Sequence, residues 1–403
     1  MQSIMKKFPI IILLGTLLFS CKEEKPLSPM LTDANPPGQV SNVDIKPEPG
    51  GATISYVLPK SQNLSYIVAE IKTPDGRLRT YKSSFYTNQL RVEGLGDESE
   101  YEVRIYSVNG AEVRSEPVVK KFTPTEPPYL KVFKSLNMFA AFGGVGVTYL
   151  NPDNQSLQAI LIGPDSLGRI SQLNATTLDQ EAGNATFRGL KDEETVFGMY
   201  LEDRWGNRSD TTFATITPLF EKMLDKSKFR PYKMPNDPIL VNQWNVAIEF
   251  AFDGKWSSVW ASPYDGNGNN WQNVSTNTKG LDPTWITFDM GVQSKLSRFR
   301  LNHYYRYSNG AMRRYEIWGS NNPAPDGSWA SWTKLVDYEQ KKPSGLPVEV
   351  YNDADATAWL LGDQKDFPLD APAVRYIRVR CLESWMGMAD LSFSEITLFG
   401  QPM

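Results

Sequence analysis

The sequence predicts an all-β protein made of several domains. Aromatic residues are frequent, with 11 Trp, 18 Tyr and 19 Phe among 403 residues, and they occur together with 29 Gly and 28 Pro. Aromatic side chains favour strands while glycine and proline mark turns, so this composition favours many short strands over helices. Segments that alternate apolar and polar residues recur along the chain with turn signals between them. At typical domain size the length suggests about two to four domains.

Charge and histidine content exclude several classes of function. The formal net charge is -4, and charges of both signs are mixed without a basic stripe, so we expect no nucleic-acid partner. His303 is the single histidine. A multi-histidine metal centre is therefore impossible, and a Ser-His-Asp triad could be built only on His303. Cys381 lies in an alternating segment and is predicted to be a buried small hydrophobe, not a reactive thiol.

The N-terminus has the features of a secretion signal. Two lysines precede an apolar run of 12 residues, 8–19, which is too short to span a bilayer. The sequence Leu-Phe-Ser-Cys that ends at Cys21 resembles a bacterial lipobox, which implies lipidation of Cys21; an unlipidated signal is the alternative. Lys-Glu-Glu after it resembles the surface-export signal of Bacteroidota lipoproteins. We therefore expect a signal peptide over residues 1–20, a lipidated tether over 21–37, and an anchor on the outer face of an outer membrane.

Residues 38–125 are predicted to form a first β-sandwich. Strand-like alternation recurs three times within these limits, with Pro-Gly and Pro-Asp-Gly turns between the segments. Leu95 precedes Tyr101 by six positions in GLGDESEYEV. This spacing resembles the tyrosine corner of fibronectin type III and immunoglobulin-like domains, in which the phenol closes a corner between two strands.

Residues 126–218 repeat this plan. The segment FRGLKDEETVFGMYLED echoes VEGLGDESEYEVRIYSV, and Gly189 follows Gly94 by 95 positions. The Thr-Pro pairs that end the two units recur with an offset of 94. So steady an offset predicts a second Ig-like sandwich of similar size. Val196 stands where the corner tyrosine is expected, so this corner must close in another way.

A helical linker is predicted over residues 219–234. Leu219, Phe220, Met223 and Leu224 fall on one face of a helix, and charged residues fall opposite. Prolines follow this segment, so we expect a short connecting helix.

Residues 235–403 contain six short motifs in a characteristic order: AFDGKWSSVW, PTWITFDMG, YEIWGSN, WTKL, VRYIRV and FSEITLFG. This order resembles the discoidin, or coagulation-factor type-C, family of galactose-binding-like jelly rolls, which includes many carbohydrate-binding modules. The resemblance specifies the fold more closely than the ligand, because such modules bind sugars, lipids or proteins through variable loops. The whole chain resembles a three-domain lipoprotein family of unknown function found among the polysaccharide-utilisation systems of Bacteroidota.

The type-C resemblance also implies a structural calcium ion. In that family calcium often joins the first loop to the last strand. The matching positions here are Asp253, the main chain of Lys255, Ser258 and Glu395, and their oxygens are of the kind that calcium prefers. The alternative is that Asp253 caps a turn and Glu395 pairs with an arginine.

Ligand residues are expected on the loops at one end of this module. A sugar needs an aromatic surface for its apolar face and directional polar groups for its hydroxyls. In sugar-binding members of the family a histidine and an arginine from middle loops contact hydroxyls, and a late aromatic stacks on the ring. By order, the candidates are Trp271, His303, Tyr305, Arg306 and Trp385. Alternatively, His303 caps a strand and the tryptophans serve in packing.

Together these features predict a non-catalytic cell-surface lipoprotein that captures polysaccharide through its C-terminal module, with other outer-membrane utilisation proteins as possible partners. A first alternative is a protein-binding structural or assembly lipoprotein of an outer-membrane complex. A second is a glycoside hydrolase, which needs only a pair of carboxylates. No motif in the sequence marks such a pair.

Overall fold

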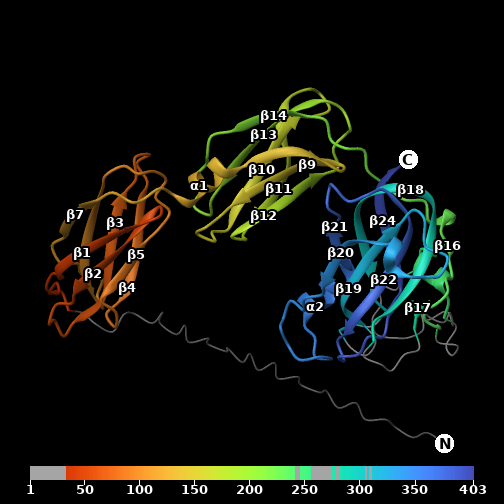
Figure 1. The fold of residues 1–403 in the computed structure, drawn as a ribbon. Coiled ribbons are helices and arrows are strands. Elements are labelled where there is room, and N and C mark those ends of the chain that lie inside the picture. The colour runs from red at the N-terminus through yellow and green to blue at the C-terminus, as the bar shows by residue number, and fades with distance from the viewer. Residues whose placement is uncertain (1–32, 241–245, 256–273, 277–281, 305, 308–310) are drawn as a thin grey trace, which may run out of the picture. The chain divides into compact units, whose positions relative to one another are not determined.

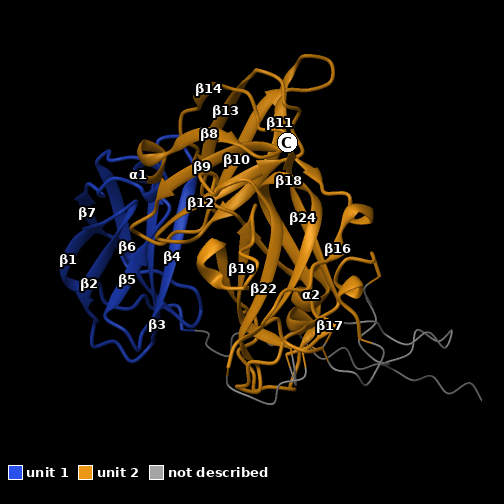
Figure 2. Ribbon diagram, turned by 45° about the vertical axis from the view of Figure 1, so that its right-hand side comes forward, with its two compact units in different colours: residues 1–131 blue, residues 132–403 orange. Residues whose placement is uncertain are grey.

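The computed structural model describes residues 33–240, 246–255, 274–276, 282–304, 306–307 and 311–403. The predicted signal peptide, Cys21 and most of the tether lie outside these ranges. The chain divides into two compact units, residues 1–131 and 132–403 (Figure 2). The described residues form 24 strands and only two α-helices, so the predicted all-β class is confirmed.

The first unit contains a seven-stranded sandwich (Figure 1). One sheet has the order β1-β2-β5 and the other β4-β3-β6-β7. Tyr101 is buried, and its hydroxyl donates to Asp97 Oδ1 at 2.8 Å, so the phenol closes the corner as expected. The strands are β1 (Ser41–Glu48), β2 (Gly51–Val57), β3 (Leu64–Lys72), β4 (Leu78–Ser84), β5 (Gln89–Val92), β6 (Tyr101–Asn109) and β7 (Val118–Phe122).

The second sandwich repeats the same topology after a short helix, which confirms the repeat. Its sheets have the orders β8-β9-β12 and β11-β10-β13-β14, which correspond strand for strand to those of the first sandwich. The elements are α1 (Pro128–Ser135), β8 (Asn137–Ala141), β9 (Gly144–Leu150), β10 (Leu157–Pro164), β11 (Ile170–Leu178), β12 (Ala182–Arg188), β13 (Thr195–Glu202) and β14 (Thr212–Ile216).

The predicted linker helix over 219–234 is wrong. This segment forms β15 (Lys222–Met223), the 3₁₀ turn η1 (Lys226–Lys228) and β16 (Arg230–Pro231). Its backbone pairs with the last module instead of with itself, because β15 joins β24 (Glu395–Pro402) and Leu224 donates to Leu398. Met223 stays 56% exposed, whereas Leu224 is buried in the core of that module. Tertiary pairing thus overrides the helical spacing of the apolar residues.

The last module is a jelly roll around β18 (Thr284–Asn302), as predicted. The first half of β18 pairs with β22 (Val374–Ser384), and its second half pairs with β24 and β21 (Asp363–Asp366). β22 in turn pairs with β19 (Met312–Ser320), which lies next to it in Figure 1. The remaining elements are η2 (Ile248–Ala251), β17 (Val274–Ser275), η3 (Trp329–Ser331), β20 (Thr333–Glu339), α2 (Asp353–Leu361) and β23 (Ser392–Phe393).

β18 buries alternate side chains, as a strand with one face on the core does, and it does not end at Gly291. Ile286, Phe288 and Met290 all lie in the core. The strand continues through Gly291, whose φ of 72° is readily adopted only by glycine, and a register shift between β18 and β22 falls there. Cys381 on β22 is buried as expected, and burial raises the pKa of its thiol to about 12.

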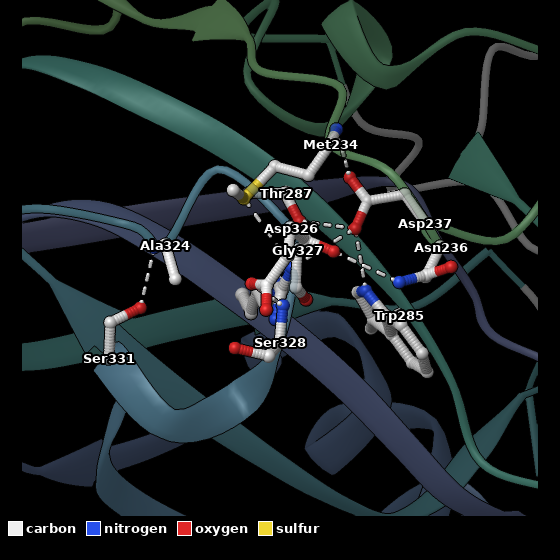
Figure 3. Close-up of polar contacts among 11 residues, drawn as sticks. Met234, Asn236, Asp237, Trp285, Thr287, Ala324, Asp326, Gly327, Ser328 and Ser331 are labelled. Atoms are coloured by element: carbon white, nitrogen blue, oxygen red, sulfur yellow. Dashed lines mark hydrogen bonds and ion pairs between the residues drawn. The ribbon is translucent and has the colours of Figure 1, made fainter.

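A buried arginine joins the beginning of the last module to its sheet. The Arg378 side chain is 0% exposed, and its guanidinium donates to Asp237 at 3.3 Å and to the Gly327 carbonyl at 3.1 Å. Asp237 also accepts from the Trp285 indole at 2.8 Å (Figure 3). The guanidinium carbon lies 4.4 Å from the centre of the Trp332 ring. Burial lowers the pKa of Arg378, so the Asp237 carboxylate is the charge that keeps the guanidinium stable there.

Candidate functional site

The structure brings three of the predicted ligand residues to one end of the jelly roll. His303 directly follows β18, Arg306 lies in the same loop, and Trp385 directly follows β22. The other two predicted residues, Trp271 and Tyr305, lie outside the described ranges. The same end carries α2 and the segment before it, which the sequence did not single out.

Trp385 is a half-buried indole that is held in one orientation. Its Nε1 donates to Gln340 Oε1 at 2.6 Å, and its main-chain N–H donates to the Ala311 carbonyl at 3.0 Å. The Tyr307 ring contacts it edge to face, with the ring centres 5.4 Å apart. The Arg313 guanidinium lies 5.6 Å from the ring centre. Because the ring is already fixed, little side-chain conformational entropy is lost when it binds a ligand.

Tyr307 supports the Trp385 ring from the buried side. Its φ is 44°, a conformation that a bulky residue adopts only when its surroundings hold it, and the side chain is 1% exposed. Burial, together with the negative charges of Asp355 and Asp363, raises the pKa of Tyr307 to about 12. The phenol is therefore neutral at physiological pH. Strain of this kind is common at functional sites.

His303 lies beneath the loops and not at their surface. Its side chain is 0% exposed, and its Nε2 lies 2.6 Å from Asp363 Oδ2. The same carboxylate accepts from the Tyr315 hydroxyl at 3.0 Å and from Gln340 Nε2 at 3.1 Å. His303 is thus connected to Trp385 through Asp363 and Gln340. A side chain with no exposed surface can position a ligand-binding residue but does not itself contact a ligand in this state.

Arg306 is buried against two aromatic rings. Its guanidinium carbon lies 4.9 Å from the Trp359 ring centre on α2 and 5.4 Å from that of Tyr351. Burial lowers the pKa of Arg306, and the cation is retained because aromatic faces and nearby acidic groups favour it. Arg306 therefore joins the β18 loop to α2.

The segment before α2 is ordered by two buried charges. Lys342 donates to the carbonyls of Leu346, Pro347 and Val350. Asp355, in the first turn of α2, accepts from the main chain and the hydroxyl of Ser344 at 2.9 and 2.6 Å. Burial alone would raise the pKa of Asp355, but these hydrogen bonds outweigh it and lower the pKa. The site thus has a rigid wall on its α2 side.

The residues predicted to bind calcium contact a lysine instead. Glu395 is buried, and its carboxylate accepts from Lys226 Nζ and from the Gly254 main-chain N–H, the latter at 3.1 Å. Lys226 also donates to Thr397 at 2.8 Å. An ammonium ion already neutralises this carboxylate, so the described donors do not fit calcium.

The other calcium positions add no further ligand in the described ranges. Asp253 is exposed and accepts from the Lys255 main chain at 2.8 Å, which is a turn cap. Ser258 lies outside the described residues. Across the part of the chain that the structure describes, no group of three or more His, Cys, Asp or Glu side chains is placed to hold a metal ion. Calcium binding is thus left to a chelator test, for which the described contacts predict no effect.

The sequence did not indicate Gln340, Tyr351 or Asp363 as site residues. Each reaches the site from a position far from its partner in sequence: 45 residues separate Gln340 from Trp385, and 60 separate His303 from Asp363. The one local signal was Asn-Asp-Ala-Asp at residues 352–355. There the Asn352 side chain accepts from the Asp355 N–H at 3.0 Å as part of a capping box that begins α2.

Comparison with known families divides the chain into three parts. Residues 37–124, 125–227 and 260–400 each match a family described as a domain of unknown function. No curated protein matches the chain. Among the described residues, no helix is long and apolar enough to cross a membrane.

Solved structures similar to this chain include proteins of three kinds. A SusE-like protein is 28% identical over 69% of this chain and 100% of its own, with a TM-score of 0.45. The family 32 carbohydrate-binding module of NanJ from Clostridium perfringens, solved with galactose, is 16% identical over 44% of this chain and 98% of its own, with a TM-score of 0.29. A two-domain fibronectin type III segment of chicken tenascin is 13% identical over 45% and 99%, with a TM-score of 0.22.

Proposed function

We propose that this chain is a non-catalytic carbohydrate-binding protein whose ligand site is formed by the loops around Trp385. The supporting observation is the Trp385 indole itself, half-exposed and fixed by Gln340 and Tyr307. The apolar face of a pyranose can stack on such a ring while neighbouring polar groups bind its hydroxyls. The proposal rests on these residues. The SusE-like and carbohydrate-binding neighbours suggest the same ligand class but do not carry the argument.

Two carboxylates that support the Trp385 loops, Asp363 and Asp355, are buried and already hydrogen-bonded within the protein. Glycoside hydrolysis requires two carboxyl groups that face the scissile bond, one as acid and one as base or nucleophile. Here Asp363 is 5% exposed and accepts three side-chain hydrogen bonds, and Asp355 is 0% exposed and caps α2. Both carboxylates are committed to holding the loops in place. Neither of these two carboxylates is free to act as a catalytic acid or base, which supports capture of a sugar over its cleavage.

We further propose that the protein is a lipoprotein anchored through Cys21 on the cell surface, where it holds polysaccharide near other outer-membrane utilisation proteins. The lipobox-like sequence before Cys21 supports this proposal. Many anchored copies on one membrane would bind a long polysaccharide with avidity even if each site binds weakly. Metabolic labelling with a fatty acid tests the anchor: the wild type should incorporate label, and Cys21→Ala should not. Incorporation by the variant would contradict lipidation at Cys21.

Affinity electrophoresis of the chain from Lys22 onward through gels that contain individual polysaccharides tests the ligand site. We expect one class of polysaccharide to retard the wild type and Trp385→Ala to remove most of the retardation. Trp205→Ala is a matched control, because Trp205 is also half-exposed but lies in a turn of the second sandwich. Absence of retardation by every polysaccharide would refute carbohydrate binding. Retardation as strong in Trp385→Ala as in the wild type would refute the assignment of the site.

A further inference from the structure

A cleft lies within the unit formed by residues 132–403, and none of its lining residues belongs to the Trp385 loops. Its volume is about 410 Å³, within the range of small-molecule sites. One wall is a face of the sheet β12-β9-β8 in the second sandwich, and the other is the end of β21 with the residues after it. The lining residues include Phe139, Asn184, Thr186 and Arg188 on the first wall and Asp366 on the second.

The aromatic ring of Phe139 lies over the main chain of Gly146. Phe139 on β8 and Gly146 on β9 are register partners, and a Cβ added to Gly146 would come within 2.4 Å of two atoms of the Phe139 ring. Gly146 has no positive φ, so its backbone conformation does not require glycine. The missing side chain instead makes room for the ring. One face of the half-buried ring therefore lies on the sheet while the side chain lines the cleft.

A row of polar side chains lies beside this ring. Asn184, Thr186 and Arg188 alternate along β12 and so share one face of the sheet. Arg188 donates to Asp366 Oδ2 at 2.6 Å, and Thr186 donates to the same oxygen at 3.4 Å. Within the described ranges, no protein group hydrogen-bonds the Asn184 amide or Asp366 Oδ1. These two groups are therefore available to a ligand.

The first sandwich shows that the fold does not require this cleft. Thr53 on β2 holds the position that Gly146 holds on β9, two residues after the glycine that begins each strand. Thr53 donates to Glu48 at 2.7 Å, and Arg91, its register partner on β5, pairs with Glu48 at 3.0 Å. The polar groups on that face thus satisfy one another. In the second copy the same face carries an aromatic ring and the Asn184 amide, which makes no hydrogen bond to protein within the described ranges.

We propose that this cleft binds a short stretch of pyranose residues from a neutral polysaccharide, as a second site in addition to the Trp385 loops. The Phe139 ring receives the apolar face of a pyranose, and the Asn184 amide and Asp366 Oδ1 bind its hydroxyls. Arg188 pairs with Asp366, and Lys365, the other charged residue that lines the cleft, donates to the Asp337 carbonyl. The cleft therefore lacks the cluster of like charges that would select an anionic or a cationic ligand. The inference adds a site to the proposed function, and the two sites are tested by separate substitutions.

The test is isothermal titration of the chain from Lys22 onward with four neutral trisaccharides: cellotriose, xylotriose, mannotriose and galactotriose. In a Trp385→Ala background, which removes the loop site, we expect at least one of them still to bind. Asn184→Ala should then weaken binding about tenfold through loss of a hydrogen bond. Phe139→Leu, which keeps an apolar cover over Gly146, should weaken it by a similar factor. Asn137→Ala is the matched control, because Asn137 is an exposed asparagine on β8 that does not line the cleft.

Two results would overturn the proposal. One is that none of the four trisaccharides binds the Trp385→Ala chain. The other is that binding is equally strong in the Asn184→Ala and Asn137→Ala variants. The first result leaves the loop site supported if the wild type binds, and the second leaves it supported if Trp385→Ala weakens the binding seen in the wild type. Asn184 is exposed, and within the described ranges its side-chain amide makes no hydrogen bond to protein, so its substitution tests the cleft without disturbing the fold.

Discussion

Replacement of Arg378 by methionine should destabilise the last module more than any surface change on the same strand. Arg378 is fully buried, and its partner Asp237 is 7% exposed in its side chain. Methionine retains most of the volume but removes the charge and all the hydrogen-bond donors. Asp237 would still accept from the Trp285 indole and the Met234 main chain. Its charge, however, would be buried without a cation.

The expected loss of stability in Arg378→Met follows from the buried ion pair. Removal of one partner of a buried ion pair costs about 3–5 kcal/mol, because the remaining charge stays desolvated. The contact with the Trp332 ring, at 4.4 Å, contributes in the same direction but is not additive with the pair. Asp237 retains neutral donors, so we place the loss near the lower limit, at about 3 kcal/mol. For a module of this size that lowers the melting temperature by about 10 °C.

Urea denaturation followed by tryptophan fluorescence measures this effect. All but one of the 11 tryptophans, Trp205, follow residue 240, so the signal reports on the last module. Arg380→Met is the matched control on the same strand, because Arg380 is 28% exposed and its pair with Glu316 at 3.4 Å is worth less than about 1 kcal/mol. Asp237→Asn should recover part of the stability lost in Arg378→Met, since it removes the unpaired charge. The reasoning fails if Arg378→Met is no less stable than Arg380→Met.

The remaining predictions concern Glu395, Lys226 and the start of α2. Burial raises the pKa of Glu395 from 4.5 to about 7 despite Lys226, so the stability that Glu395 contributes is full below about pH 4.5 and is lost as the pH rises through 7. In Glu395→Gln the melting temperature should therefore vary less between pH 5 and 8 than in the wild type. An equal dependence of the melting temperature on pH in the two proteins would contradict this. Lys226→Met should lower the melting temperature because Glu395 loses its cation, whereas a calcium chelator should leave the wild type unchanged; a chelator-induced drop would support calcium instead. Asn352→Ala should cost about 1 kcal/mol and speed amide exchange in α2, and unaltered exchange would argue against the cap.

The two sandwiches could be predicted because their signals are local. Strand alternation has a period of two residues, and the 95-residue offset between Gly94 and Gly189 shows that one plan is used twice. The structure confirms the same two-sheet order in both copies. By contrast, the spacing of apolar residues at 219–224 also suits a helix. Only the presence of β24 as a pairing partner for β15 decides that this segment is extended.

The candidate site was predictable in part. Loop position after a strand indicated His303 and Trp385, and both do lie at one end of the jelly roll. Their surroundings were not predictable: His303 is buried against Asp363, and Gln340 fixes Trp385. No sequence period marks a contact between residues that lie 45 or 60 positions apart. Likewise, the ammonium of Lys226 at Glu395 could not be inferred from the type-C resemblance.

The sequence by itself determined the all-β class, the repeat, the jelly roll and the end of that jelly roll at which Trp385 lies, because each depends on periodicity, spacing or motif order along the chain. Only the tertiary structure decided which polar side chains pair with one another inside the protein and which remain available to bind a ligand. Buried charges must find partners wherever the fold brings donors and acceptors together. For that reason Arg378 pairs with Asp237 across 141 residues, while Asn184 is left facing a cleft.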